Sequence, residues 1–479
     1  MARDTISFYL NGKLERVSGP YAMGPLSDYL RYKKQQTGTK VVCAEGDCGA
    51  CTVMIDRSVQ KSSQEVSFHS INSCIAMVAL LDGCHVVTVE GLETNGELHP
   101  VQESIVKNFG AQCGFCTPGF VMALTDLHEQ KDHLKERHVK NFLTGNLCRC
   151  TGYSPIINAG LGVDKNNYVK LKDRYTEHQG YHSFKNEIRN PIHLKFNEFE
   201  TEYEFVAPQN LKDAVDYISK NPTVRIISGS TDLGVQINKR KTKVHKAMSL
   251  QNIPEMYELR VSDGKIIVGA RVTLSELQSV LEDNLPAFGR FLNIFASPQI
   301  KNKATLVGNI ANASPIADTT PVLMALDSVL QIVGKSGSRV VALKDFYLGY
   351  KKLDLKDGEF IASVEIPIPA NAIVDAFKIS QRRDLDISCV NLAVVADING
   401  RKLEKIAMSA GGVAATTIRL EVLEKKWQGQ SLDYIKDDIS KLDFSKFVSP
   451  LSDVRGTAEF RTRALKNLIS KFFAQMSET

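Results

Sequence analysis

The sequence has little excess charge and no long apolar run, and each shortage excludes a class of function. Its 59 basic and 54 acidic side chains leave a net charge of +5 on 479 residues. That imbalance is too small to indicate a nucleic-acid or membrane-surface protein. The longest apolar runs resemble Ile75–Leu81, whereas a membrane-spanning helix needs ~18–20 residues. The first six residues contain no apolar segment of the secretory kind. We therefore expect a soluble, cytoplasmic protein of about three domains.

Common nucleotide and metal motifs are missing too. No Gly-x-Gly-x-x-Gly fingerprint occurs in the chain. Gly334-Lys335-Ser336 is not a Walker A loop, because Val329 stands where its first glycine belongs. His128-Glu129 does not continue into the zinc-protease pattern, because Asp132 replaces the second histidine.

Cysteine is scarce after residue 150. Nine of the ten cysteines lie in the first 150 residues, and Cys389 is the tenth. In a reducing compartment, clustered thiols are more often metal ligands than disulfides. Cys84 and Cys389 belong to no ligand pattern, so we expect them to be packed thiols. The other eight form two groups.

The first group has the spacing of plant-type [2Fe–2S] proteins, with three thiolates from one loop and a fourth from a distant element. Its members are Cys43, Cys48, Cys51 and Cys74. Gly46 and Gly49 allow this loop to curl and to point N–H groups at the sulfurs. The alternative is a structural zinc site, whose cysteine pairs are usually spaced Cys-x2–4-Cys.

The flanks of this group favour a ferredoxin-like β-grasp fold. Asn11-Gly12 is a strong hairpin signal between two short β-runs. The spacing predicts strands over Ile6–Leu10, Lys13–Val17 and Cys51–Ile55, and helices over Ser27–Gln36 and Ser70–Leu81. Cys74 is expected on the second of these helices, which Gly83 ends.

The second group combines a Cys-x2-Cys pair with a Cys-x-Cys pair, which is unusual for structural zinc. Its members are Cys113, Cys116, Cys148 and Cys150. Thr117 and Pro118 predict the N-cap and first residue of a helix that runs to about Gln130. Ser154 and Pro155 repeat this device after the second pair. Two positive helix ends would then face an anionic iron–sulfur cluster.

Two later stretches have phosphate-binding character. Val224–Gly234 predicts a strand, a small-residue turn and a helix, whose N–H groups can hold a diphosphate. Such turns are also common wherever αβ units pack. Ala304–Asp318 is rich in small, hydrogen-bonding residues, unlike a plain core strand. Asp318 suits a ribose hydroxyl, or else it is the N-cap of a helix over Thr319–Leu326.

Two motifs carry a resemblance to a known family. Gln112-Cys-Gly-Phe-Cys-Thr-Pro-Gly119 and Leu147-Cys-Arg-Cys-Thr-Gly-Tyr153 resemble those of the xanthine dehydrogenase family of molybdenum hydroxylases. Within it, the chain is similar to subunits that join the iron–sulfur and flavin parts. The two later stretches resemble the family's FAD domain, which is related to vanillyl-alcohol oxidase.

The resemblance implies an α+β multidomain fold. It places a β-grasp [2Fe–2S] ferredoxin domain at 1–88 and a helical [2Fe–2S] domain at 89–163. A FAD-binding domain at 192–369 and an α+β CO-dehydrogenase-flavoprotein-like C-terminal domain at 370–479 follow. The polar segment 164–191 is expected to be a linker, or else a surface excursion of a neighbouring domain. Thr457–Gln475 has the apolar spacing of a C-terminal helix.

The resemblance also implies site residues. The 113/116/148/150 cluster is expected nearest the molybdenum cofactor, with Gln112 close to the molybdopterin, and the 43/48/51/74 cluster nearer the flavin. The FAD positions that match are Ile226, Ile227, Ser228, Gly229, Ser230, Thr231, Asp232, Leu233, Phe295, Thr305, Gly308, Asn309, Asp318, Ile361 and Lys378. Arg382-Arg383-Asp384 matches a loop that borders the flavin and the nicotinamide site, or it is a solvated hairpin arm. Leu385 and Cys389 stand where relatives often carry acidic and basic residues.

The family's cofactor order implies a function. Electrons would pass from molybdopterin-bound molybdenum on a larger partner subunit, through two [2Fe–2S] clusters, to FAD and then to NAD. The chain itself shows no catalytic residue for the substrate, which we expect to be hypoxanthine or xanthine. The same relay also serves aldehyde and N-heterocycle hydroxylases. A stand-alone flavin and iron–sulfur reductase and a zinc-stabilised scaffold remain open alternatives.

Overall fold

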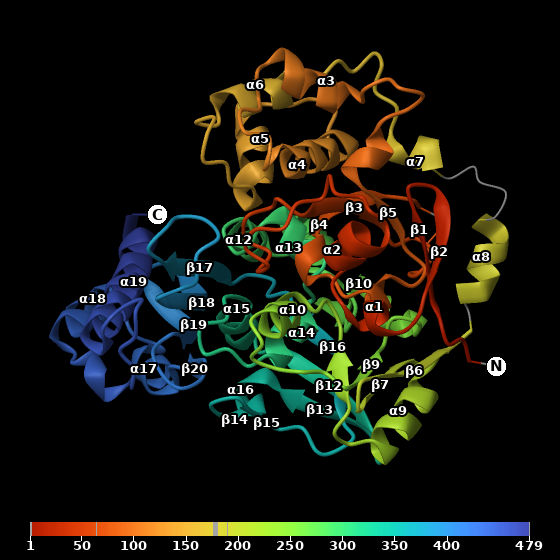
Figure 1. Cartoon of the computed structure of the whole chain (residues 1–479). Helices are drawn as coiled ribbons and strands as arrows, with labels where there is room; N and C mark the ends of the chain where they lie inside the picture. Colours follow the sequence, from red (N-terminus) through yellow and green to blue (C-terminus); the bar gives the residue numbers. More distant parts are fainter. Residues whose placement is uncertain (1, 64, 176–180, 189, 479) are drawn as a thin grey trace. The chain divides into compact units, whose positions relative to one another are not determined.

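The chain folds into two compact units. The computed structural model describes residues 2–63, 65–175, 181–188 and 190–478. The first unit holds Met1–Pro254 together with Ser297–Ala304, and the second holds Glu255–Ala296 and Thr305–Thr479. Figure 1 shows the course of the chain through both.

The first unit begins with a five-stranded sheet. Its strands are β1 (Ile6–Leu10), β2 (Lys13–Val17), β3 (Thr52–Asp56), β4 (Phe68–Asn72) and β5 (His85–Val87). They are ordered β2-β1-β5-β3-β4, and only the β1–β5 pair is parallel. Asn11 and Gly12 join β1 and β2 with φ angles of 49° and 79°, as a tight hairpin turn requires. The predicted hairpin is confirmed residue for residue.

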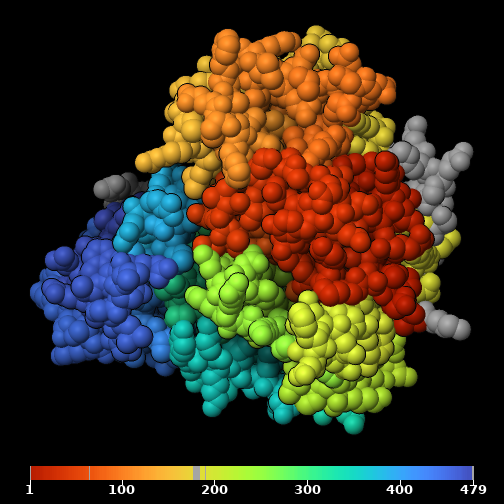
Figure 2. Space-filling model, in the orientation of Figure 1, coloured from red at the N-terminus to blue at the C-terminus, as the bar shows by residue number. Residues whose placement is uncertain are grey.

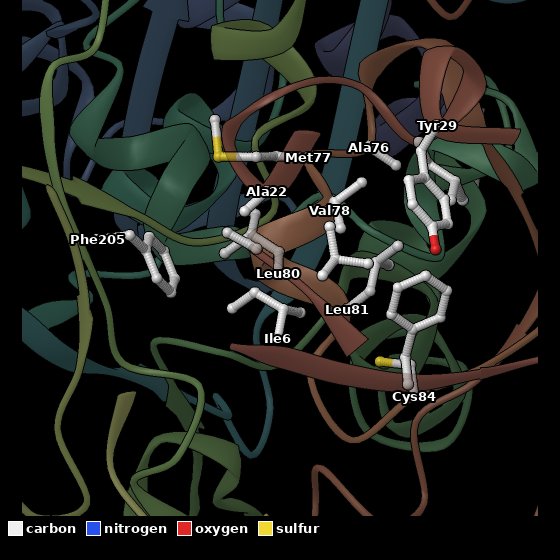
Figure 3. Close-up of a cluster of buried hydrophobic side chains, with 14 of the residues drawn as sticks. Ile6, Ala22, Tyr29, Ala76, Met77, Val78, Leu80, Leu81, Cys84 and Phe205 are labelled. Atoms are coloured by element: carbon white, nitrogen blue, oxygen red, sulfur yellow. The ribbon is translucent and has the colours of Figure 1, made fainter. Parts of the chain in front are cut away.

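Short helical turns cover this sheet. They are α1 (Pro20–Met23), α2 (Leu26–Asp28), the π-helical η1 (Tyr29–Lys33), and the 3-10 helices η2 (Ser73–Ile75), η3 (Val78–Leu81) and η4 (Val89–Leu92). Figure 3 shows side chains from η3 meeting Ile6 and Tyr29 in one buried cluster. The predicted helix over Ser70–Leu81 is wrong: β4 pairs with β3 up to Asn72, and two separate 3-10 turns follow. Cys74 therefore lies on a single tight turn.

A helical module follows. Its elements are α3 (Pro100–Lys107), α4 (Thr117–Gln130), α5 (Glu136–Phe142), η5 (Leu143–Gly145) and α6 (Ser154–Leu161). α4 is buried from Gly119 to His128; it ends at Gln130 as predicted and begins one residue earlier than predicted. The Ser104 hydroxyl of α3 donates to the Ala159 carbonyl of α6 at 2.7 Å. α4 lies at the centre of this module's core.

The segment expected as a linker contains two helices in its described part, α7 (Leu171–Tyr175) and α8 (Tyr181–Ile188). Leu171 and Tyr175 belong to the core of the helical module. Phe184 and Ile188 pack with Tyr9 on the first sheet. This segment is thus fastened to both modules, although residues 176–180 and 189 lie outside the description.

A second sheet completes the first unit. Its strands are β6 (Ile192–Glu198), β7 (Thr201–Ala207), β8 (Arg225–Ile227) and β9 (Lys246–Ser249), in the order β6-β7-β9-β8. The accompanying helices are α9 (Leu211–Lys220), α10 (Thr231–Asn238) and, from far along the chain, α13 (Pro298–Lys301).

The second unit begins with a five-stranded antiparallel sheet. Its strands are β10 (Leu259–Ser262), β11 (Lys265–Gly269), β12 (Val329–Gly334), β13 (Gly337–Ala342) and β16 (Phe360–Pro367). Their order is β10-β11-β16-β12-β13. The helices are α11 (Leu274–Asn284), α12 (Pro286–Leu292), α14 (Leu306–Ala311), α15 (Thr319–Ala325) and α16 (Leu343–Phe346). A small hairpin pairs β14 (Tyr347–Gly349) with β15 (Lys352–Leu353), and η6 (Pro254–Tyr257) opens the unit.

The unit ends in a four-stranded sheet covered by helices. Its elements are β17 (Ile373–Ile379), β18 (Val390–Asn399), β19 (Lys402–Gly411), β20 (Ile418–Arg419), α17 (Glu421–Trp427), α18 (Leu432–Lys441), η7 (Phe444–Lys446) and α19 (Ala458–Glu478). The strands follow one another in sequence order. Trp427 is fully buried, and its indole N–H donates to Asp438 of α18 at 2.8 Å. The expected α+β architecture is confirmed, and no helix within the described residues is long and apolar enough to cross a membrane.

Candidate cofactor sites

The four thiols of the first group lie within reach of one another. They belong to Cys43, Cys48, Cys51 and Cys74. Hydrogen bonds from the Cys48 and Cys74 thiols hold the pKa of Cys43 far below its ordinary value. A bond from Cys74 also lowers the pKa of Cys51, against the burial that would raise it. Cys48 and Cys74 donate these hydrogen bonds. The bonds, together with burial, raise the pKa of both thiols. The structure thus brings together the four cysteines that the sequence proposed as one ligand set.

Backbone and side-chain N–H groups point at these sulfurs. The Glu45 amide lies 3.4 Å from the Cys43 sulfur, and the Asn72 side-chain amide lies 4.0 Å from that of Cys51. Gly46 and Gly49 have φ angles of 76° and 67°, which let the loop turn its amides inward. Such N–H groups stabilise the negative charge of an anionic cluster.

The second group consists of two thiol pairs. The sulfurs of Cys113 and Cys150 lie 3.6 Å apart, and both residues are exposed. Burial and the hydrogen bond that the Cys116 thiol donates to Cys148 raise the pKa of Cys116 to about 12. Burial would raise the pKa of Cys148 too, but hydrogen bonds from Thr151 and from Cys116 lower it.

The helix starts beside these thiols differ by one residue from the prediction. Cys116, and not Thr117, occupies the N-cap of α4, and Tyr153 occupies that of α6 with a φ of 71°. Cys116 is therefore itself at the positive end of its helix. The Tyr153 hydroxyl accepts a hydrogen bond from the Cys148 amide at 3.0 Å, which fixes the Cys-x-Cys turn.

The pairing of the sulfurs fits binuclear clusters. Metal–sulfur bonds of about 2.3 Å at a tetrahedral angle place two thiolates of one metal ion about 3.7 Å apart, close to the Cys113–Cys150 distance of 3.6 Å. No three His, Cys, Asp or Glu side chains in the described part of the chain are placed to hold a single metal ion. Four thiolates shared between two irons are the ligands of a [2Fe–2S] cluster.

The backbone links the two groups directly. The Leu147 amide, next to Cys148, donates to the carbonyl of Cys48 at 3.0 Å. The buried Asn146 side chain donates to the Gly49 carbonyl at 3.3 Å and accepts from Gln299 of α13 at 2.7 Å. These bonds hold a ligand of the first group against a ligand of the second.

Glycines make this approach possible. A methyl group on Gly119 of α4 would lie 2.1 Å from the Gly49 carbonyl, and one on Gly49 would lie 2.3 Å from the Gly145 carbonyl. Side chains do not fit at such distances, so the two modules can meet only where these positions lack a Cβ.

The strand, turn and helix predicted over Val224–Gly234 are present in the first unit. β8 ends at Ile227, Ser230 adopts the left-handed conformation with a φ of 58°, and α10 begins at Thr231. The first amides of a helix have no partner inside it, and the Ser230 side chain does not cap them. Its hydroxyl donates instead to the Ile75 carbonyl at 3.1 Å. A methyl on Gly229 would lie 2.1 Å from the Lys303 carbonyl. Amides at a helix start suit an anionic phosphate.

Asp318 is the centre of a buried polar network in the second unit. Lys378 of β17 lies 2.7 Å from its Oδ2, and the Asn391 amide of β18 donates to its Oδ1 at 2.9 Å. The Ser388 hydroxyl donates to the same Oδ1. Asp318 does occupy the N-cap of α15, but its side chain does not cap that helix. The N-cap position of Asp318 is confirmed, but its carboxylate binds the network and does not cap the helix. The assignment of this carboxylate to a ribose hydroxyl stays a prediction.

The other residues assigned to FAD lie in the second unit on several elements. Thr305 caps α14 by accepting the Gly308 amide at 3.1 Å, and Asn309 accepts the Thr319 hydroxyl at 2.6 Å. Half-buried Phe295 and buried Ile361 complete the set. Thr305, Gly308 and Asn309 come together on one helix.

Two further residues that the sequence assigned to sites are exposed. Gln112 is exposed immediately before Cys113. Arg382 opens a loop in which its amide donates to Asp386 at 2.9 Å. Leu385 in this loop has a φ of 60°. The loop is thus a defined turn with an exposed guanidinium.

Sequence reasoning missed four polar residues. Asn146 and Gln299 link the cysteine groups, and Ser388 and Asn391 hold Asp318. Asn391 did give a signal, since it is polar within the apolar run 390–396. Asn146 directly precedes the motif Leu147–Tyr153, but no spacing or periodicity in the sequence marks Asn146, Gln299 or Ser388 as a binding residue.

Family models match the chain in four consecutive segments. Residues 8–79 match the 2Fe-2S iron-sulfur cluster binding domain, and 88–161 the [2Fe-2S] binding domain. Residues 198–369 match the FAD binding domain in molybdopterin dehydrogenase, and 375–476 the CO dehydrogenase flavoprotein C-terminal domain. The predicted order of iron–sulfur and flavin domains is confirmed.

Curated relatives align along nearly the whole chain. The xanthine dehydrogenase of Oryza sativa is 30% identical over 98% of this chain and 39% of its own length. The xanthine dehydrogenase/oxidase of Gallus gallus is 31% identical over 98% and 40%, respectively. The chain spans about two fifths of the length of these relatives. The CO dehydrogenase from Oligotropha carboxidovorans contains a chain that is 25% identical with a TM-score of 0.53, over 56% of this chain and 95% of that one.

Proposed function

We propose that the chain is the electron-transfer subunit of a xanthine dehydrogenase, because its segments match iron–sulfur and flavin domains of molybdenum hydroxylases and it aligns with xanthine dehydrogenases along nearly its whole length. Electrons enter from molybdopterin-bound molybdenum on a larger partner subunit, pass through two [2Fe–2S] clusters to FAD, and leave to NAD. The observation that carries this proposal is the contact between the two thiol groups, through the hydrogen bond from Leu147 to Cys48. When bound, the clusters supply one-electron transfer and the flavin converts it to hydride transfer.

The residues of the chain hold these groups and set their surroundings. Four cysteines bind each cluster, and amides such as that of Glu45 stabilise its negative charge. From the Cys48 sulfur, the path to the Cys148 sulfur runs through covalent bonds and the single hydrogen bond at Leu147. In the first unit, the α10 turn is assigned to the diphosphate of FAD. In the second unit, the assignment of Asp318 to the ribose stays a prediction from the family resemblance.

The exposed surface of the helical module supports a partner at the second cluster. Cys113 and Cys150 are exposed there. The same module carries large exposed apolar side chains: Val106, Phe109, Phe115, Leu147 and Leu161. Exposed apolar patches on soluble proteins commonly mark protein contacts. We assign this surface, with Gln112, to the molybdenum subunit.

Xanthine or hypoxanthine as substrate is supported by the relatives named xanthine dehydrogenase, which align over 98% of the chain. NAD as acceptor is supported by the exposed loop at Arg382, whose guanidinium lies 3.6 Å from the Asp386 carboxylate and is 67% exposed, so that it can also pair with a phosphate. An aldehyde or N-heterocycle hydroxylase would use the same relay.

The test uses the complex isolated from its own host through a tag on this chain. Xanthine added without air is expected to bleach the flavin and iron–sulfur absorption, and NAD is expected to restore it. If dithionite reduces intact clusters but xanthine does not, the substrate assignment is wrong. If zinc replaces iron in the preparation, the relay itself is wrong.

Cysteine variants assign the ligands in the same complex. Cys113→Ser is expected to remove one cluster signal, whereas Cys84→Ser is the matched control, because Cys84 is buried in the hydrophobic core of the first sheet. Equal iron content in the two variants would contradict the assignment.

A further inference from the structure

A run of cations follows α10. Residues Lys239–Lys246, here called the basic loop, contain five Lys or Arg residues and no acidic residue. All five are exposed. Lys239 pairs with Glu45, and Lys246 pairs with Glu202 and Glu204. The remaining cations, Arg240, Lys241 and Lys243, form no ion pair with any described residue.

The basic loop is fixed next to the first thiol group. Asn238, the residue before it, donates to the carbonyls of Ala44 and Cys74, each at 2.8 Å. The Lys239–Glu45 pair adds a second link, since Glu45 lies between Cys43 and Cys48. Figure 2 shows this lime-coloured region at the surface beside the red N-terminal module. The basic loop therefore starts at a point that is fastened to the Cys43 loop.

An exposed apolar residue lies at the same place. Val42, directly before the ligand Cys43, is 64% exposed. Val42 thus lies two and three residues before Ala44 and Glu45, to which Asn238 and Lys239 are bonded. Interfaces that bury less than about 1,200 Å² of surface in total are typical of transient electron-transfer complexes.

We propose that the basic loop and Val42 are a docking surface for a small acidic protein that carries one electron. The proposal rests on the iron–sulfur function given above. The carrier gives one electron to the oxidised first cluster and becomes oxidised by one electron, or the reverse occurs when the cluster is the reduced partner. No proton moves and no bond breaks. The molecule would then have a protein redox partner in addition to a nicotinamide.

The position of the surface favours such a carrier over other anions. A nucleic acid or an anionic membrane is attracted by cations anywhere on a surface, and its binding does not require a position beside a cluster ligand. A redox carrier needs both, because cations guide it to the site and the apolar contact brings its own cofactor close to Cys43. The net charge of the whole chain, +5, is also small, so the local charge decides where an acidic partner binds.

The test measures electron entry into the full chain with both clusters assembled. The probe is a reduced, acidic plant-type ferredoxin, whose low potential favours electron donation. The loop variant is Arg240→Gln/Lys241→Gln/Lys243→Gln. The matched control is Lys335→Gln/Lys352→Gln/Lys356→Gln, which changes the net charge equally at exposed positions. A small neutral quinone serves as a second reaction partner.

The loop variant is expected to lower the second-order rate constant at least tenfold at low ionic strength, and less at high salt. The control triple is expected to stay within twofold of the wild type, and the quinone rate is expected to be unchanged in both. Val42→Ser is expected to lower the rate at all salt concentrations. Equal effects of the two triples would overturn the proposal, as would loss of oligonucleotide or anionic-vesicle binding with an unchanged ferredoxin rate. Absence of iron–sulfur absorption in the wild type would instead overturn the proposed function.

Discussion

The ammonium group of Lys378 lies 2.7 Å from the carboxylate of Asp318, and the two side chains are only 1% and 6% exposed. The residues are sixty positions apart in the chain. A buried pair of this kind tolerates the loss of both charges better than the loss of one, because a single charge would remain in a low-dielectric interior.

Lys378→Met is therefore expected to lower the free energy of unfolding of the second unit by about 3–5 kcal/mol. Asp318→Asn/Lys378→Met is expected to recover most of that loss. The single tryptophan, Trp427, is buried in this unit, so its fluorescence in a urea titration reports the effect. If the double variant were as unstable as Lys378→Met, the unpaired charge of Asp318 would not be the cause of the lost stability.

Gly229→Ala tests the diphosphate turn. The new methyl would collide with the Lys303 carbonyl, and overpacking of this kind costs about 1–3 kcal/mol. We expect bound FAD to fall roughly tenfold in affinity, with the iron content unchanged. Gly349→Ala is the control, because nothing lies within 4 Å of a methyl there. Equal flavin content in both variants would argue against the turn as a FAD site.

Gly119→Ala tests the contact between the thiol groups. Its methyl would displace the Gly49 carbonyl, so the two modules would separate slightly. Electron paramagnetic resonance of the fully reduced protein is expected to show both clusters with a weaker magnetic interaction. Leu147→Pro, which removes the amide that donates to Cys48, is expected to slow transfer between clusters. Unchanged transfer in both variants would exclude this route.

Two buried histidines make the helical module sensitive to acid. Burial lowers the pKa of His99 and of His128 to about 4, whereas an unfolded histidine titrates near 6.5. Between these values the unfolded chain binds more protons, so stability falls as the pH falls. Between pH 7.5 and pH 5, each histidine is expected to lower the free energy of unfolding by roughly 2 kcal/mol.

Hydrogen exchange in α4, corrected for the intrinsic rate, measures this loss. The control is His128→Asn, which does not titrate and can still donate to the Gly160 carbonyl that His128 contacts. It is expected to halve the pH dependence. A slope equal to that of the wild type would show that His128 is not its source.

Local signals in the sequence predicted the local structure well. The Asn11-Gly12 turn predicted the first hairpin, and the pattern after Thr117 predicted α4 to within one residue at its start. The helix expected over 70–81 failed because a short apolar run fits a buried strand or turn as well as a helix. All residues of η3 are buried, so no polar face distinguished these cases.

The two sets of cysteine ligands could be predicted because the spacing of cysteines along the chain is itself typical of the metal site that they form. The partners of Asp318 were not, since Ser388 and Asn391 reach it from about seventy residues away. Such contacts depend on how β17 and β18 pair, which no short window of the sequence contains.

The return of α13 to the first unit has a consequence for synthesis. Ile300 packs with Cys74 and Ile75, and the Asn302 side chain donates to the Ser70 carbonyl at 2.8 Å. The first unit is thus interrupted after Pro254 and resumes at Ser297. At ~5–20 residues per second, a ribosome needs a further ~3–10 s to deliver the missing segment. During that interval the nascent chain carries an unfinished surface beside its first four ligand cysteines.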